Sequence, residues 1–271
     1  MNTVTSDVSQ AHRWRRPPLI RNPWLRFGIG IGAIVYLVLA LNTISFNPDR
    51  VARGVERVAR IMGDFLRPDF VSRWPDIQTG ILESLTMTVV ATVIGILISI
   101  PVGLGAARNL APLPVYVLCR GIVTVSRSFQ EVIIAIIFVV MLGFGPLAGV
   151  FTLAFATIGF MGKLLAEDIE EIDPLQMEAI RATGASWLQT VTYAVMPQVM
   201  QRLVGLGVYR FDINLRESAI VGIVGAGGIG ATLQISFNRY DYSVAGAILI
   251  VIIALVMTTE LVAGEIRKRL Q

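Results

Sequence analysis

Long apolar runs without a single charge alternate with short polar segments along the whole chain. Such runs cover Phe27–Pro48, Ser84–Ala107, Val132–Gly162, Ser218–Asn238 and Tyr242–Thr259. About 20 apolar residues are enough for a helix to cross the hydrocarbon core of a bilayer, and most of these runs reach that length. The pattern therefore predicts an all-α, polytopic membrane protein.

The runs and the breaks between them predict about six transmembrane helices. Their expected ranges are Trp24–Ile44, Thr79–Ala107, Leu113–Leu142, Leu147–Leu165, a helix that begins near Pro197 and ends in the glycine-rich Gly222–Gly230, and Val244–Ala263. Arginine and lysine gather at both ends of the chain, and basic flanks of membrane helices stay in the cytoplasm. We therefore expect a cytoplasmic-membrane protein with both termini inside, which requires an even number of crossings.

This pattern divides the chain into five parts and gives no sign of a second domain. A cytoplasmic tail covers residues 1–23, the first transmembrane helix 24–44, an external loop 45–78, the main transmembrane domain 79–264 and a cytoplasmic tail 265–271. Within the external loop, apolar residues recur at helical spacing between arginines and glutamates: Val51, Val55, Val58, Ile61, Met62, Phe65 and Leu66. This spacing predicts an amphipathic helix that lies on the membrane surface.

Composition supports the membrane assignment and excludes several kinds of site. Hydrophobic residues make up 54% of the chain and charged residues 15%, whereas a soluble domain carries about a quarter charged residues. Cys119 is the single cysteine and His12 the single histidine. An internal disulfide is therefore excluded, and no cluster of thiolates and imidazoles is available for a transition metal. The net charge of +4 lies largely at the chain ends and does not indicate nucleic-acid binding.

The longest polar stretch on the inner side, residues 173–197, has the signals of two capped helices and is called the elbow below. Asp173 is placed to cap a helix that has Pro174 in its first turn, and Gln176 completes the spacing of a capping box. Gly184 can take the left-handed conformation that ends a helix. Ser186 and Gln189 repeat the capping pattern for a second short helix that ends before Pro197.

The first helix of the elbow has a face suited to a partner. Glu178 and Arg181 are three residues apart and can pair, while Ala179 and Ala182 form a strip of small side chains that permits close approach. A plain cytoplasmic loop that happens to be helical would show the same capping signals.

Charged residues also fall within or near the predicted crossings: Arg120, Arg127, Glu131, Arg210, Asp212, Arg216 and Glu217, with Asn214 among them. A charge at bilayer depth costs about 2.5–3.5 kcal/mol on insertion scales, so these groups should face one another, water or a pathway. Arg127 and Glu131 are four apart and can pair on one helix face, whereas Arg216 and Glu217 need separate partners. The set could be internal ion pairs that fix helix packing, or arginines that line a pathway for an anion.

Gly225, Gly227, Gly228 and Gly230 belong to a run that matches G-x-G-x-x-G. A dinucleotide site would need a soluble βαβ unit and an acidic residue about 20 positions later, where this chain has Ile248 to Val251. The glycines instead suit close helix contact or an unwound turn. No P-loop pattern is present, so the chain is not expected to hydrolyse ATP.

The spacing of Glu178-Ala179, Gly184 and Met196-Pro197 resembles the cytoplasmic motif of binding-protein-dependent ABC importer permeases. Ile180 stands where the motif has its second alanine, Ala194 where it has isoleucine and Met196 where it has leucine. In that family the motif forms the coupling helix, which docks on the cytoplasmic ATPase. The resemblance implies that Glu178, Ala179 and Gly184, together with Arg181 on the same helix, contact the ATPase.

A second resemblance concerns the cargo. The run from Tyr209 to Gly230, the run Arg127–Glu131 and the run Glu170–Pro174 are similar to phosphonate-importer permeases. The resemblance extends from about Thr79 to the C-terminus, and in that family the glycine-rich segment lies near the outer gate. It implies a homodimer that works with an ATPase dimer and an external substrate-binding protein, with ATP bound by the ATPase and no cofactor in this chain.

Three other functions fit parts of the sequence pattern to different extents. A permease for another small solute, such as an amino acid, would share the elbow. An intramembrane enzyme needs a nucleophile with a base, or metal ligands, and no HExxH or GxSxG pattern is present. An ion channel would not need the elbow.

Overall fold

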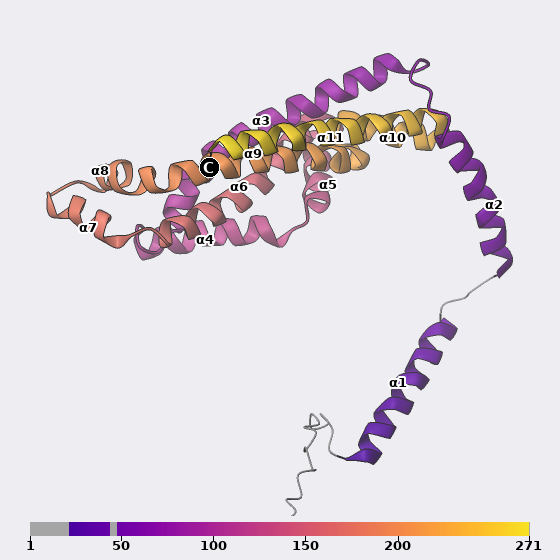
Figure 1. Cartoon of the computed structure of the whole chain (residues 1–271), viewed down its shortest axis with the longest axis horizontal. Coiled ribbons are helices and arrows are strands. Elements are labelled where there is room, and N and C mark those ends of the chain that lie inside the picture. The colour runs from indigo at the N-terminus through magenta and orange to yellow at the C-terminus, as the bar shows by residue number, and fades with distance from the viewer. Residues whose placement is uncertain (1–21, 44–47, 271) are drawn as a thin grey trace, which may run out of the picture. The chain divides into compact units, whose positions relative to one another are not determined.

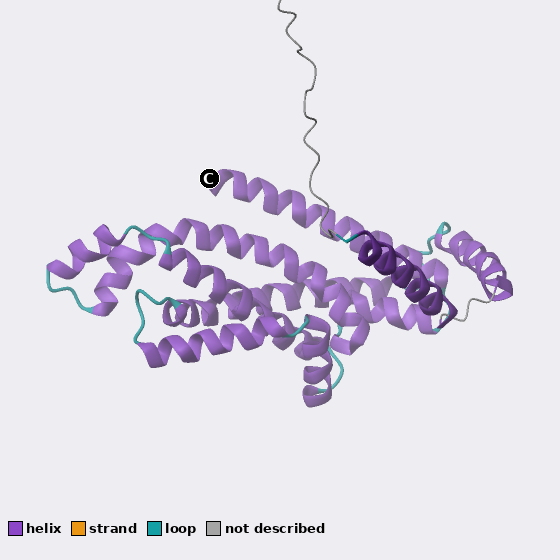
Figure 2. Cartoon of the chain, turned by 90° about the horizontal axis from the view of Figure 1, so that it is seen from below, coloured by secondary structure: helices purple, strands orange, loops and turns teal. Residues whose placement is uncertain are grey.

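The computed structural model describes residues 22–43 and 48–270, and every element in these ranges is a helix (Figures 1 and 2). The predicted N-terminal tail up to residue 21, with His12, lies outside this part, as do residues 44–47 and Gln271. Contacts divide the chain into two units, Met1–Val58 and Ala59–Gln271. The first contains α1 (Pro23–Thr43) and the beginning of α2 (Pro48–Phe65).

The second unit is a bundle of long helices. Its elements after α2 are α3 (Trp74–Ala106), α4 (Leu113–Ser128), α5 (Glu131–Leu142), α6 (Pro146–Glu170), α7 (Pro174–Ala182), α8 (Trp187–Thr190), the π-helix η1 (Val191–Val195), α9 (Met196–Val221), the π-helix η2 (Gly222–Ala226), α10 (Gly228–Asn238) and α11 (Tyr242–Leu270). Helices α3, α6, α9 and α11 run along one another, with α7 and α8 at one end and α10 at the other (Figure 1).

Four described helices are long and apolar enough to cross a membrane: α1, α3, α6 and α11. Two bent pairs pass the same test together, which raises the number to six if each pair is one span. The first pair is α4 with α5, and the second runs from α8 through α9 to α10. The apolar runs therefore located the helices, although they did not reveal the bends.

The predicted crossing Leu113–Leu142 is not one helix. Phe129 and Gln130 have extended backbones, and α4 and α5 meet there at 96°. Neither glycine nor proline marks this break, so its cause lies in tertiary packing: Ile134, Ala135 and Val139 of α5 are buried against the rest of the bundle. Because the helix is interrupted, Arg127 and Glu131 are no longer one turn apart on a common face.

The last predicted crossings also differ in extent. Residues 228–238 form a separate helix, α10, which the periodicity did not predict. The expected tail 265–271 is helical as far as Leu270, because α11 continues through it. Phe65, which was expected on the membrane-facing stripe of α2, instead packs against Phe237 and Tyr242, with ring centroids 6.0 and 6.1 Å away.

The α3–α6 interface is built from small residues. The buried side of α3 carries glycine, serine, threonine and alanine at helical spacing: Gly80, Ser84, Thr88, Ala91, Thr92, Gly95, Ser99 and Gly103. A Cβ added at Gly95 would lie 2.5 Å from Thr157 of α6, and one at Gly103 would lie 2.8 Å from Leu165. Small residues let helix backbones approach closely in lipid, where packing rather than water exclusion drives association.

The turn between α2 and α3 is held by Asp69. Its carboxylate accepts hydrogen bonds from the Ser72 hydroxyl and from the backbone N–H groups of Val71 and Ser72. These bonds lower the pKa of the Asp69 carboxyl, with the Ser72 side chain as the largest cause. Because the pKa is lowered, the stabilisation is present above the ordinary aspartate pKa and is lost as the pH falls below it.

We predict opposite effects of alanine at two glycines. A Cβ at Gly230 would collide with the Ala219 carbonyl oxygen, so Gly230→Ala should separate α10 from α9 and destabilise the fold by about 1–3 kcal/mol. Gly121 has nothing within 4 Å, and Gly121→Ala should be neutral or stabilise helix α4 by up to about 1 kcal/mol. Thermal unfolding in detergent micelles measures both; equal losses in the two variants would contradict this packing argument.

Candidate functional site

The elbow begins at a capped helix, α7. The Asp173 side chain accepts a hydrogen bond from the backbone N–H of Leu175 at 3.0 Å, as the capping pattern predicted. The expected capping box with Gln176 is wrong. The Asp173 N–H donates instead to Oε1 of Gln198 at 3.3 Å, so the start of α7 is tied to α9 rather than closed on itself.

The bend of the elbow depends on Gly184. Its φ is +82°, a left-handed conformation that glycine adopts without a steric penalty. Ser186 and Gln189 then form a complete capping box at the start of α8. The second arm does not end before Pro197 as expected, because α8 continues through η1 into α9. The elbow is therefore the extended end of a long helix plus one short helix folded beside it.

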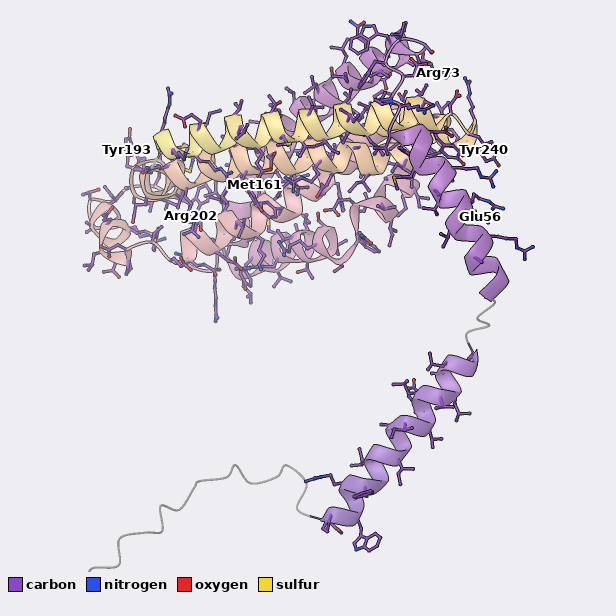
Figure 3. All side chains as sticks on the ribbon, turned by 45° about the vertical axis from the view of Figure 1, so that its right-hand side comes forward. Glu56, Arg73, Met161, Tyr193, Arg202 and Tyr240 are labelled. Atoms are coloured by element: carbon purple, nitrogen blue, oxygen red, sulfur yellow. The ribbon has the colours of Figure 1, made fainter. Side chains whose placement is uncertain are left out.

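Buried apolar side chains, a hydrogen bond and an ion pair fix the elbow to the bundle. Met177 of α7 and Val195 of η1 belong to the same apolar cluster as Ile169 of α6. The indole N–H of Trp187 donates to the Leu110 carbonyl at 3.1 Å. Arg202 of α9 pairs with Asp168 at 2.9 Å across to α6. Figure 3 shows Tyr193 and Arg202 toward this end of the bundle and Arg73 and Tyr240 toward the other.

The outer face of α7 is free for a partner. Glu178, Ala179 and Arg181 are exposed, while Met177 is buried. The predicted pair between Glu178 and Arg181 is absent from the ion pairs of the described residues. Both charges thus remain available, and Leu175 of α7 and Leu188 of α8 are exposed as well.

A buried polar network joins three helices at the middle of the bundle. Asn214 of α9, fully buried, donates from Nδ2 to the hydroxyls of Thr92 on α3, at 2.8 Å, and Thr157 on α6, at 3.0 Å. Arg210, 3% exposed, donates from Nε to the same Thr157 hydroxyl at 3.1 Å. The Thr157 hydroxyl in turn donates to the Leu153 carbonyl.

The predicted membrane charges form ion pairs within α9. Arg210 reaches Glu217 at 3.2 Å and Arg216 reaches Asp212 at 3.1 Å, so the adjacent Arg216 and Glu217 do pair separately. Glu131, at the start of α5, faces Glu217 within hydrogen-bonding reach rather than pairing with Arg127. Arg210 also lies over the Phe160 ring, 5.3 Å from its centroid. These contacts favour a packing role for Arg210, Asp212, Asn214 and Glu217.

The glycine-rich segment is a hydrogen-bonded break between α9 and α10. Gly225 has φ +98° and packs against the Phe144 ring, and its carbonyl accepts from the Gly145 N–H at 3.0 Å. Gly227 and Gly228, also at positive φ, complete the turn. Gly230 lies in the first turn of α10 against α9.

Glu83 of α3 is the polar partner of this break that the sequence argument missed. Its carboxylate accepts from the Gly228 N–H at 2.8 Å at the start of α10, where the helix dipole favours an anion. Ser84 accepts from the next N–H, that of Ile229, at 3.0 Å. A lone acid at the edge of an otherwise apolar helix was the signal that could have identified it.

The part of the chain that the structure describes contains no candidate metal site, because no group of three or more His, Cys, Asp and Glu side chains comes together there.

Comparison with known proteins decides the family. The family model for binding-protein-dependent transport system inner membrane components matches residues 99–270. The chain belongs to this family. The match contains the elbow, the glycine-rich break and three members of the buried polar network, Thr157, Arg210 and Asn214, so these are features of a transport subunit rather than of an enzyme active site.

Individual relatives agree with this assignment. The phosphate-import permease PhnE of Mycolicibacterium smegmatis is 42% identical over 93% of this chain, which spans about half (47%) of that protein's length. The phosphite transport system permease PtxC of Stutzerimonas stutzeri is 37% identical over 89% of this chain and 86% of its own. Among solved structures, the inward-facing MetNI methionine ABC transporter matches with a TM-score of 0.61 and 26% identity, over 73% of this chain and 97% of that one.

We predict that the two partners of the buried ion pair differ in their importance. Arg210→Gln leaves Glu217 and Glu131 facing each other without their buried cation, and breaking a buried pair in this way costs about 3–5 kcal/mol. Glu217→Gln keeps an oxygen for Arg210 and removes one of the two facing acids, so it should cost less than half as much. Thermal unfolding of the two variants in detergent tests this; equal destabilisation would contradict the assigned geometry.

Proposed function

We propose that the chain is the membrane-spanning permease of an ABC importer for a phosphorus oxyanion: phosphonate, phosphite or phosphate. The observation that carries the proposal is the similarity to the phosphite permease along nearly the whole of both chains. The phosphate-import permease supports the same class of cargo. A phosphorus oxyanion also suits a chain with arginines in its transmembrane part, because guanidinium groups bind such oxygens in a bidentate fashion.

In this proposal the elbow is the part of the chain that the ATPase contacts and moves. Its exposed residues Glu178, Ala179 and Arg181 dock on a cytoplasmic ATPase, and Gly184 keeps α7 folded back beside η1. Two copies of the chain form the pathway, with two ATPase subunits below and an external binding protein that delivers the cargo. Closure of the ATPase dimer moves the elbows and favours an outward-open state. Both termini then lie in the cytoplasm.

The charged interior and the glycine-rich break have separate roles in the proposal. Arg127 of α4 and Arg216 of α9 are exposed, whereas Arg120 is half-buried and Arg210 is buried, and we assign Arg127 and Arg216 to the pathway. Gly225, Gly227, Gly228 and Gly230 form an outer gate with the Phe144 turn. An amino-acid importer is the second candidate; it is supported by the methionine transporter fold, at lower identity.

Substrate stimulation of ATPase activity tests the cargo. The permease is reconstituted in nanodiscs with its ATPase and binding protein. This complex should hydrolyse ATP faster with phosphonate, phosphite or phosphate than with methionine. We expect at least a several-fold stimulation by one phosphorus oxyanion. Stimulation by methionine alone would reject the phosphorus cargo and leave the importer assignment standing.

A bulky substitution tests the docking face. Ala179→Trp should block close approach of the ATPase and reduce substrate-stimulated hydrolysis at least tenfold, without loss of thermal stability, because Ala179 is exposed. Ala59→Trp, at an exposed alanine of α2, is the matched control and should keep full activity. Normal coupling in the Ala179 variant would show that the ATPase binds elsewhere.

A further inference from the structure

A small cationic cavity lies between α4 and α6, on the half of the bundle nearer the elbow. Its volume is about 260 Å³, and it is lined by Arg120, Val123, Thr124, Arg127, Ser128 and Lys163. Three of these six residues carry a positive charge and none carries a negative one. A tetrahedral oxyanion needs the space of a few water molecules at about 30 Å³ each, so the cavity has room for one with some hydration.

The antiparallel packing of α4 and α6 brings the cations together. Arg120, Thr124 and Arg127 follow one another about a turn apart along α4, and Gly159 and Lys163 do so along α6. Gly159 makes room first for Ser126 and then for the arginine: a Cβ there would collide with the Ser126 side chain and would lie 3.2 Å from Cγ of Arg127. The Arg127 stem therefore lies across α6 one turn above Lys163.

The acids near the cavity all lie at its elbow end. Arg120 pairs with Glu170 at 2.8 Å, and Lys163 pairs with Glu167 at 3.4 Å. Arg127 has no ion pair with any described residue, although its helix is part of a candidate membrane span. The Nε of Arg120 is buried and has no hydrogen-bond partner. Positive charge is thus in excess, and the excess increases with distance from the elbow.

The two hydroxyl groups of the cavity already donate hydrogen bonds to backbone carbonyls, so the cations are the groups that can recognise an anion. Thr124 donates to the Arg120 carbonyl and Ser128 to the Thr124 carbonyl, both at 2.7 Å, so their protons are already used within α4. A ligand that binds here must accept hydrogen bonds from guanidinium and ammonium groups. Charge-assisted bonds of this kind, from an arginine fork to phosphorus oxygens, are among the strongest that a protein makes.

We propose that this cavity binds the phosphorus oxyanion on the cytoplasmic half of its path, with Arg127 as its main ligand. The proposal rests on the proposed function for the identity of the cargo. Arg127 binds the anion as it arrives from deeper in the membrane. Lys163 and Arg120 contact the anion when their ion pairs with Glu167 and Glu170 open. When Glu167 and Glu170 pair again with Lys163 and Arg120, they displace the anion toward the cytoplasm.

A protection experiment tests binding without turnover. Ser128→Cys, in a Cys119→Ser background, places one thiol at the cavity of the full complex in nanodiscs of neutral lipid. Inorganic phosphate or phosphite at millimolar concentration should slow its modification by a negatively charged methanethiosulfonate at least fivefold. Arg127→Gln should abolish this protection, Arg127→Lys should restore part of it, and Arg269→Gln, at an exposed arginine far along α11, should leave it intact.

A second measurement keeps the inference testable if the cysteine variant does not fold. Binding of radiolabelled phosphate to the permease with its ATPase, without the external binding protein and with the chain otherwise unaltered, should weaken at least tenfold in Arg127→Gln and not in Arg269→Gln. Equal binding in the two variants would overturn the inference. Protection of the cysteine by phosphatidylglycerol in the nanodisc, with no effect of free phosphate, would also overturn it and make the cavity a lipid headgroup site.

The inference and the proposed function fail separately. If a phosphorus oxyanion stimulates ATPase activity but Arg127→Gln transports it with unchanged KM and kcat, this cavity is not on the path. If no phosphorus oxyanion stimulates the complex, the cargo assignment is wrong, whatever the protection experiment shows.

Discussion

Close approach of α3 and α6 is the constraint on which the rest of the bundle depends. Their small residues bring the two backbones near enough for Thr92 and Thr157 to share the Asn214 side chain of α9. Larger residues at Gly95 or Gly103 would force the helices apart. In lipid, an unsatisfied amide or guanidinium is expensive, so the position of α9 is set by a network that exists only at this short separation.

The same arrangement gives the elbow a firm base. Met177 and Val195 are buried in the cluster that contains Ile169 of α6, and Arg202 bonds across to Asp168. A force on α7 therefore acts on the ends of α6 and α9 together. Because η1 continues without a break into α9, displacement of the elbow is carried along one helix toward the polar network.

Much of the fold follows from the sequence. The parts that cannot be predicted from it share a common cause. The apolar runs located the long helices, and Asp173, Gly184 and Ser186 marked the elbow because capping and left-handed turns are local chemistry. The break at Phe129 and Gln130 carries no local signal, since packing of α5 decides it. The predicted ion pair between Arg127 and Glu131 is wrong for the same reason, because the break separates the two residues. Glu83 was missed because its partners, the N–H groups at the start of α10, are about 145 residues away.

The turn at Gly145 has a mechanical consequence. Its N–H bonds to the Gly225 carbonyl of η2, while the opposite end of α5 brings Glu131 to Glu217 of α9. Helix α5 is thus hydrogen-bonded to η2 beyond one end and is drawn to α9 at the other end only through Arg210, because the facing carboxylates of Glu131 and Glu217 repel each other. The turn at Gly145 is therefore held to the glycine-rich break directly, whereas the other end of α5 keeps its place only while Arg210 supplies the positive charge between the two acids.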